Sequence, residues 1–370
     1  MKFFHKMALS MLVLALSLMV AAPVSAGEEH TMTKGAVYTM TNSQTGNEVI
    51  RYDRAADGTL SLAGTFPTNG MGTGGGLGNQ GGLVLSEDGS MLLAVNAGSN
   101  EISAFRVKSS SLMLTDRVSS GGIMPVSIAI HEDLVYVLNA GGTGNIGGFR
   151  LSDSGKLSMI AGSTRPLSGV ATDPAQIAFD PDGEVLVVTE KATNMVDTYT
   201  VDEDGIANGP MPQASNGQTP FGFAFDKKGN LMVSEAFGGA PGASALSSYA
   251  VDDDGTLETI SGSVPDFQTA ACWVVVTKNG KFAYTSNTGS NTISGYNVSK
   301  KGMISLLDQD AGTTDAGPID MALSKNSRFL YSLNSGAHTI TGFRVHSDGS
   351  LTPVTSVGGL PAGANGLASR

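Results

Sequence analysis

Short apolar runs that alternate with clusters of Gly, Asn and Ser make up most of this chain. In the stretch from Leu92 to Val107, LLAVNAGSNEISAFRV, an apolar run ends on Asn96, a small loop follows, and a second run alternates apolar and polar residues. The same arrangement returns from Lys281 (KFAYTSNTGSNTISGYNV) and from Arg328 (RFLYSLNSGAHTITGFRV). Short runs rich in β-branched and aromatic residues are typical of β-strands. The pattern therefore predicts a β-hairpin that is repeated along the chain.

One polar residue ends the central apolar run of each repeat. These residues are Asn42, Asn96, Asn139, Glu190, Glu235, Asn287 and Asn334, at intervals of 43 to 54 residues. Such a period is typical of four-stranded propeller blades. A solenoid of helical repeats is the rival, but no stretch after residue 26 sustains apolar residues at helical spacing. The sequence predicts an all-β protein, a seven-bladed β-propeller with four-stranded antiparallel blades.

Two tight-turn signals divide each repeat into four strands. Pairs such as Asp182-Gly183 and Asp204-Gly205 accept the positive φ that two-residue hairpins demand. The first repeat lacks its first strand, because the run from Ala36 to Thr41 already has the pattern of a second strand. The segment from Ala364 to Ala368 resembles the missing piece. We therefore expect the C-terminal strand to pair with the first blade and close the ring, which leaves no open sheet edge.

The N-terminal residues have the pattern of a secretory signal peptide. Lys2 and Lys6 form a basic head, Met7 to Val20 an apolar core, and small residues lead to a cleavage site at Ala26. We expect residues 1–26 to be removed and residues 27–370 to form a single propeller domain. No later run approaches the roughly 20 apolar residues of a membrane span. We expect a periplasmic or extracellular protein without a membrane span.

Charge and cysteine content narrow the range of partners. Loss of Lys2 and Lys6 changes the formal net charge from -11 to -13. An acidic surface repels a phosphate backbone, which argues against nucleic acid as a partner. Cys272 is the only cysteine, so an intrachain disulfide and a cysteine-based metal site are excluded. We expect a monomer that binds a small molecule or a protein.

Propeller geometry indicates where a ligand binds. The tight turns lie on one face, and the longer Gly-rich connections lie on the other, where the seven repeat-ending residues are expected to converge around the central channel. Loops on that face are the expected ligand site. The longest connection, Thr68 to Gly82 (TNGMGTGGGLGNQGG), is predicted to be a lid or a channel-lining loop, with a simple linker as the alternative.

Glu190 and Glu235 replace Asn in adjacent repeats. Two carboxylates near a channel mouth can share a proton, bind a cation, or act as acid and base. We predict them as the catalytic pair, with a divalent cation as an optional ligand and no required cofactor. The alternative is a pair of solvated or salt-bridged acids, with Lys191 beside Glu190 as a partner.

Further residues are predicted to bind substrate because they end repeats or begin first strands. They are Asn96, Asn139, Gln176, Phe221, Trp273, Asn287, Asp320 and Asn334. An Asn at a strand end commonly bonds to its own loop backbone, which is the structural alternative for these Asn residues. Trp273 either stacks on a ring-shaped ligand or packs between blades.

The repeat resembles the seven-bladed β-propeller lactonase family, which includes 6-phosphogluconolactonase-like and carboxymuconate cyclase-like proteins. The resemblance rests on strings such as AFDPDGEVLVVTE from Ala178, LAVNAGSNEISAF from Leu93 and FRVHSDGSLTPV from Phe343, and TAACWVVVT is similar to an exported branch. It implies hydrolysis or isomerisation of a small lactone at the channel. Cytosolic members carry Arg and His after the Pro of the first strand. This chain has Val126-Ser127 and Ala175-Gln176 there, so a phosphorylated substrate is not expected.

Two other interpretations stay open. One is a non-catalytic propeller that binds a small ligand, a glycan or a protein on the same face. The other is an extracytoplasmic scaffold without a small ligand. Because a fold does not settle a function, the choice depends on the geometry of the site.

Overall fold

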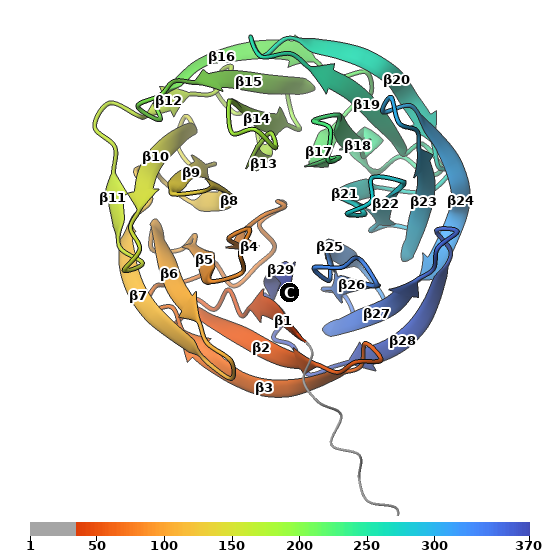
Figure 1. The fold of residues 1–370 in the computed structure, drawn as a ribbon, viewed down its shortest axis with the longest axis horizontal. Coiled ribbons are helices and arrows are strands. Elements are labelled where there is room, and N and C mark those ends of the chain that lie inside the picture. Colours follow the sequence, from red (N-terminus) through yellow and green to blue (C-terminus); the bar gives the residue numbers. More distant parts are fainter. Residues whose placement is uncertain (1–34) are drawn as a thin grey trace, which may run out of the picture. The chain divides into compact units, whose positions relative to one another are not determined.

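The computed structural model describes residues 35–370, which form seven antiparallel sheets around a common axis (Figure 1). This confirms the predicted seven-bladed propeller, in which each blade has four strands that run from the centre outwards as first to fourth. The expected signal peptide, residues 1–26, lies outside the described residues. Within residues 35–370, no helix has the length and apolar character needed to cross a membrane.

The first three blades contain the following strands. Blade 1 has β29 (Asn365–Ser369), β1 (Gly35–Met40), β2 (Glu48–Arg54) and β3 (Leu60–Pro67). Blade 2 has β4 (Leu83–Leu85), β5 (Met91–Asn96), β6 (Glu101–Val107) and β7 (Leu112–Ser119). Blade 3 has β8 (Pro125–His131), β9 (Leu134–Asn139) and β10 (Asn145–Leu151), and its outer strand is divided into β11 (Leu157–Met159) and β12 (Arg165–Pro166). Both pieces pair with β10.

The remaining blades follow the same plan. Blade 4 has β13 (Pro174–Phe179), β14 (Val185–Glu190), β15 (Met195–Val201) and β16 (Ala207–Ala214). Blade 5 has β17 (Pro220–Phe225), β18 (Leu231–Glu235), β19 (Ala245–Val251) and β20 (Leu257–Pro265), with a 3₁₀ turn at Phe237–Gly239. Blade 6 has β21 (Ala271–Val276), β22 (Phe282–Asn287), β23 (Thr292–Val298) and β24 (Ile304–Thr313). Blade 7 has β25 (Pro318–Leu323), β26 (Phe329–Asn334), β27 (Thr339–Val345) and β28 (Leu351–Val357).

The C-terminal strand closes the ring as predicted. β29 pairs antiparallel with β1, with Val37 opposite Ser369 and Met40 opposite Asn365. Blade 1 is therefore built from both ends of the described chain, and its first strand has a partner along its length. Because β29 covers β1, blade 1 has the same four strands as the other blades and the edge of β1 is not left unpaired.

The second strand of each blade forms the core, because neighbouring blades pack on both of its faces. Every residue of β5, β9, β14, β22 and β26 is buried, whereas the outer strand β3 is exposed along most of its length. Tyrosines of these strands also tie one blade to the next. The hydroxyls of Tyr136, Tyr284 and Tyr331 donate to the carbonyl oxygens of Gly205, Gly349 and Gly58 at 2.7 to 2.8 Å.

The connections divide the propeller into two faces. We call the side that carries the first-to-second and third-to-fourth connections the turn face, and the side with the other connections the loop face. Asp-Gly turns such as Asp204-Gly205, with φ of 80° at the glycine, lie on the turn face. The loop face carries the longest connection, between β3 and β4.

Candidate functional site

The polar residues that end the second strands point away from the central axis and into their own blades. Asn96, Asn287 and Asn334 each donate from Nδ2 to a hydroxyl seven residues later, on Ser103, Ser294 and Thr341, at 2.7 to 2.8 Å. Asn139 instead donates to Asn145 Oδ1 at 2.8 Å. All four Asn side chains are buried. These bonds go to side chains, whereas the structural alternative expected a bond to the backbone of the Asn's own loop. Asn96 also accepts hydrogen bonds from the Asn47 amide and the Thr68 hydroxyl of blade 1, at 3.0 and 2.7 Å. The substrate-binding role of the four Asn residues stays a prediction.

The Glu190 side chain is also buried within its blade, and a second carboxyl group lies beside it. Its carboxylate accepts hydrogen bonds from the backbone N–H and hydroxyl of Ser168 and from the Thr193 hydroxyl. Asp197, seven residues later, accepts from the same Ser168 N–H at 3.0 Å. Burial, followed by the hydrogen bond and negative charge of Glu190, raises the pKa of Asp197 to about 8. Asp197 therefore retains its proton at neutral pH.

Glu235 has a separate set of partners in blade 5. It accepts hydrogen bonds from the Gly217 N–H at 2.8 Å and from the hydroxyls of Ser247 and Ser263 at 2.5 and 2.6 Å. Burial raises the pKa of this carboxyl group, although these hydrogen bonds oppose the shift.

Glu190 and Glu235 do not form the shared site that we expected at the channel mouth. Both side chains are fully buried, no hydrogen bond joins them, and they have no hydrogen-bond partner in common. The physical reason is the direction of the strand-end side chain, which points along its own sheet. The catalytic role assigned to the two residues stays a prediction, and their burial does not favour it. Within residues 35–370, no three His, Cys, Asp or Glu side chains gather in a metal-binding arrangement.

Polar residues of the first strands join neighbouring blades. Gln176 of β13 bonds through its amide to both the N–H and the carbonyl of Phe223 in β17, at 2.7 and 3.0 Å. Asp320 of β25 accepts the Leu367 N–H of β29 at 2.9 Å. Burial raises the pKa of Asp320 well above its ordinary value. Two predicted substrate-binding residues therefore have their polar atoms engaged between blades.

The long β3–β4 loop reaches towards the centre of the ring (Figure 1). It supplies a side chain that bonds to a first strand in the way that Gln176 does. Gln80 bonds to the carbonyl and the N–H of Val274 at 2.9 and 3.1 Å, as Gln176 does to Phe223. The corresponding first-strand position of blade 5 is Gly222, where an added Cβ would lie 2.1 Å from Gln80 Oε1. Gly222 therefore leaves the space that Gln80 fills.

Two aromatic residues predicted to bind substrate contact this loop instead. Trp273 donates from Nε1 to the Asn79 carbonyl at 2.8 Å and lies 5.0 Å from the Phe221 ring. Lys191 sits over the Phe221 ring and donates to the Gly78 carbonyl at 2.6 Å. The loop thus closes the loop-face side of the axis, as a channel-lining segment. Cavities of about 280 and 380 Å³ adjoin residues 76–81 of the loop, and a cavity of about 690 Å³ adjoins its first residues, Asn69 to Met71.

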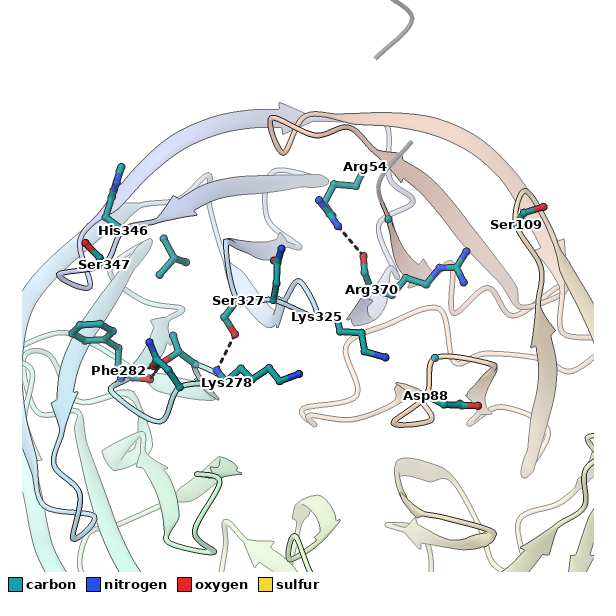
Figure 2. Close-up of a pocket in the computed structure, with 16 residues that line it drawn as sticks. Arg54, Asp88, Ser109, Lys278, Phe282, Lys325, Ser327, His346, Ser347 and Arg370 are labelled. Atoms are coloured by element: carbon teal, nitrogen blue, oxygen red, sulfur yellow. Dashed lines mark hydrogen bonds between the residues drawn. The ribbon is translucent and has the colours of Figure 1, made fainter. Parts of the chain in front are cut away.

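A cavity of about 1120 Å³ lies on the turn face and spans blades 6, 7, 1 and 2. We call it the mouth cavity. Its basic lining residues are Arg54, Lys278, Lys325 and Arg370, and His346 stands at its edge. Figure 2 shows Lys278 and Lys325 extending towards the same opening. The Lys278 N–H bonds to the Ser327 hydroxyl at 2.9 Å, which fixes the two turns side by side.

The mouth cavity is electropositive although the chain is acidic. Its only acidic side chain is Asp88, which accepts hydrogen bonds from the Ser86 hydroxyl and the Ser90 N–H. These bonds, with the charge of Lys325, lower the pKa of Asp88 to about 2. Within residues 35–370, Lys278 and Lys325 form no salt bridge. The arrangement is suited to bind a small anion.

Comparison with known proteins identifies the family of this propeller. The family described as "Lactonase, 7-bladed beta-propeller" matches residues 30–170 and 243–363. This chain belongs to the seven-bladed β-propeller lactonase family. No curated protein matches the sequence of this family member.

Several solved structures share the fold of this lactonase-family propeller at low sequence identity. The periplasmic gluconolactonase of Pseudomonas aeruginosa is 16% identical, with a TM-score of 0.69 over 89% of this chain and 98% of that chain. A candidate 6-phosphogluconolactonase of Bacteroides uniformis is 19% identical, with a TM-score of 0.71 over 90% and 98%. A Lactobacillus plantarum protein is 19% identical, with a TM-score of 0.74 over 91% and 99%. At these sequence identities, the likeness shows that the proteins share a fold.

Sequence reasoning missed the mouth cavity of this lactonase-family protein. Its basic residues come from turns that lie far apart along the chain, and the prediction placed the ligand on the opposite face. A signal was present, because Lys228-Gly229 and Lys301-Gly302 replace the usual Asp-Gly in turns of blades 5 and 6. That substitution indicated a change in the sign of the charge along the turn face.

Proposed function

We propose that this lactonase-family protein is exported, and that it binds a small sugar-acid lactone and the hydroxy acid formed from it in the mouth cavity. The observation that carries the proposal is the convergence of Arg54, Lys278, Lys325 and Arg370 on one cavity in a chain of net charge -11. A cavity of about 1120 Å³ has room for a sugar-sized ligand and bound water. The family and the gluconolactonase of similar fold support a lactone as the substrate class.

The lining residues suit lactone hydrolysis. In that reaction water adds to the lactone carbonyl, the ring C–O bond breaks, and a hydroxy acid forms. His346, whose Nε2 lies 2.8 Å from the Thr352 hydroxyl, is the lining residue suited to take the proton from water and to return it to the ring oxygen as the C–O bond breaks. Lys278 and Lys325 would stabilise the negative charge on the carbonyl oxygen and then hold the carboxylate product.

Binding without hydrolysis is a second candidate. The observation that favours it is that the lining carboxylate, Asp88, has a pKa near 2 and is therefore a weak base. His346 is also exposed, so burial does not fix the orientation of its ring. Under this alternative, the cavity holds the sugar acid and leaves its lactone unchanged.

A binding and hydrolysis panel tests the proposal. Calorimetry with gluconate and 6-phosphogluconate, and a hydrolysis assay with glucono-lactone, would be run on the mature protein and on Lys278→Ala/Lys325→Ala. We expect this double variant to lose about tenfold or more in affinity for both anions, since each close charge contact contributes about 1 kcal/mol. Lys227→Ala/Lys228→Ala, outside the mouth cavity, is the matched control and should bind normally. Equal affinity in both double variants would contradict the proposal.

The histidine separates the two candidates. If hydrolysis is catalysed, His346→Ala should lower the rate at least about a hundredfold with little change in the affinity for gluconate. A wild-type rate no faster than spontaneous hydrolysis would leave binding as the function.

Export is proposed from the N-terminal pattern and tested separately. We expect the mature protein in the periplasmic or culture fraction to begin near Gly27, as measured by N-terminal sequencing. Full-length protein retained in the cytoplasm would refute this part of the proposal and leave the ligand-binding part unaffected.

A further inference from the structure

The turn face is divided into an acidic and a basic sector. The turns of blades 3 and 4 and the outer turn of blade 5 carry the acids Glu132, Asp133, Asp153, Asp180, Asp182, Glu184, Asp202, Glu203, Asp204, Asp252, Asp253 and Asp254. The inner turn of blade 5 and the turns of blades 6 and 7 carry two acids, Asp226 and Asp348, against eight basic residues: Lys227, Lys228, Lys278, Lys281, Lys300, Lys301, Lys325 and Arg328. Although the net charge of the chain is negative, its turn face therefore has one sector of each sign.

The basic sector is hollowed by two adjoining cavities. Next to the mouth cavity lies an outer cavity of about 390 Å³, whose charged lining residues are Lys227, Lys228, Lys281 and Lys300 and one acid, Asp226. Asp226 is buried, and its carboxylate accepts hydrogen bonds from the Lys228 and Asn230 N–H groups and the Asn230 amide. Asn279 lines both cavities, so they meet at the inner turn of blade 6. We call the two cavities together the basic strip. It leads from the turns between blades 5 and 6 to blades 7 and 1.

The lysines of the basic strip differ from three basic residues of blades 2 and 3. Arg117, Arg150 and Lys156, on blades 2 and 3, form salt bridges with acids at 2.9 to 3.4 Å. Among the described residues, the four lysines of the outer cavity form no salt bridge and are exposed. Lys228 donates to the Lys300 carbonyl at 2.6 Å, which joins the two turns that border the cavity. The strip therefore offers several positive charges without acidic partners.

We propose that the basic strip binds a linear polyuronate, a chain of sugar acids with one carboxylate per unit. The proposal rests on the proposed function, since the end of the chain would occupy the mouth cavity. Flexible lysines present separate point charges, which match single carboxylates spaced along a polymer. The acidic sector repels the same polymer, so the chain is confined to the strip and follows one direction across the face.

The test compares a galacturonate oligomer, long enough to cover both cavities, with galacturonate itself. Binding of each would be measured on the mature protein by fluorescence anisotropy or calorimetry at two ionic strengths. Lys227→Gln/Lys228→Gln/Lys281→Gln should weaken oligomer binding by about tenfold and reduce its salt dependence. Monomer binding should not change. The matched control, Arg117→Gln/Arg150→Gln/Lys156→Gln, removes the same charge outside the strip and should bind the oligomer normally.

Three results would overturn the inference. Equal loss of oligomer binding in both triple variants would show a general charge effect. Tighter binding of inorganic polyphosphate than of the oligomer would assign the strip to phosphate. Self-association at low salt, seen by sedimentation without the oligomer and lost in the strip variant, would identify the acidic sector of a second copy as the occupant. Failed monomer binding with retained strip-dependent oligomer binding would refute the proposed function but support the strip.

Discussion

On the loop face, Glu235 is fully buried and both of its carboxylate oxygens are hydrogen-bonded, whereas on the turn face Lys278 is exposed and forms no salt bridge. The polar residues of the loop face hold strands, blades and the β3–β4 loop together. The basic residues of the turn face, by contrast, surround open cavities. A polar residue in a conspicuous repeat position is therefore a weak guide to a ligand site, and unpaired charge around a cavity is a better one.

Removal of the closing strand should have the largest effect of any change considered. A chain that ends before Asn365 loses the pairing of β29 with β1 and the Asp320–Leu367 bond. We expect it to be insoluble or to melt at least about 10 °C lower, since this corresponds to a loss of several kcal/mol. Circular dichroism and limited proteolysis would measure this. Normal melting of the shortened protein would contradict the closed-ring account.

The contrast between the two faces predicts that Glu235→Ala lowers the free energy of unfolding much more than Lys278→Ala does. The first change leaves the Gly217 N–H and two serine hydroxyls without their acceptor, so we expect a loss of about 2–4 kcal/mol in the free energy of unfolding. Lys278→Ala serves as the control and should change it by less than about 0.5 kcal/mol. Urea unfolding measures both. Similar losses would remove the distinction drawn between the faces.

The raised pKa of Asp197 predicts how stability depends on pH. The pKa of Asp197 is about 8 in the folded protein against an ordinary value of 3.8, so the folded state retains a proton that the unfolded state releases between these values. Stability should therefore fall as pH rises from 5 to 7, by about 1 kcal/mol per unit. Asp197→Asn removes this titration and should flatten the profile of the free energy of unfolding. If Asp197→Asn left the slope of stability against pH unchanged, Asp197 would not hold the proton assigned to it in the folded state.

Removing the Gln80 side chain of the β3–β4 loop should lower the stability of the protein by a smaller amount. Gln80→Ala removes two hydrogen bonds to Val274 and leaves the space beside Gly222 unfilled. We expect a loss of about 1–2 kcal/mol in the free energy of unfolding and faster hydrogen exchange at Val274. Gln44→Ala, an exposed residue that contacts the same loop, is the control. If Gln80→Ala and Gln44→Ala gave equal effects, the loop would not be a structural bridge.

The sequence alone predicted the fold in detail, including the seven repeats, the turns and the pairing of Asn365–Ser369 with β1. These features are local, because strand periodicity and turn residues are written in neighbouring positions, and the closing strand was identified from a gap in the repeat. The sequence also contained the polar residue seven positions after Asn96, Glu190, Asn287 and Asn334, which indicates an internal bond.

Only the tertiary structure decided where open polar surface remains. The position of Glu190 in the repeat does not state that its carboxyl group meets Ser168 and Asp197, because contacts depend on how separate segments pack. The positive charge of Arg54 likewise acquires a site only when the ring brings it beside residues 278, 325 and 370. Electrostatic fields add up in space and not along the chain, so a basic cavity in an acidic protein emerges only once the ring has closed.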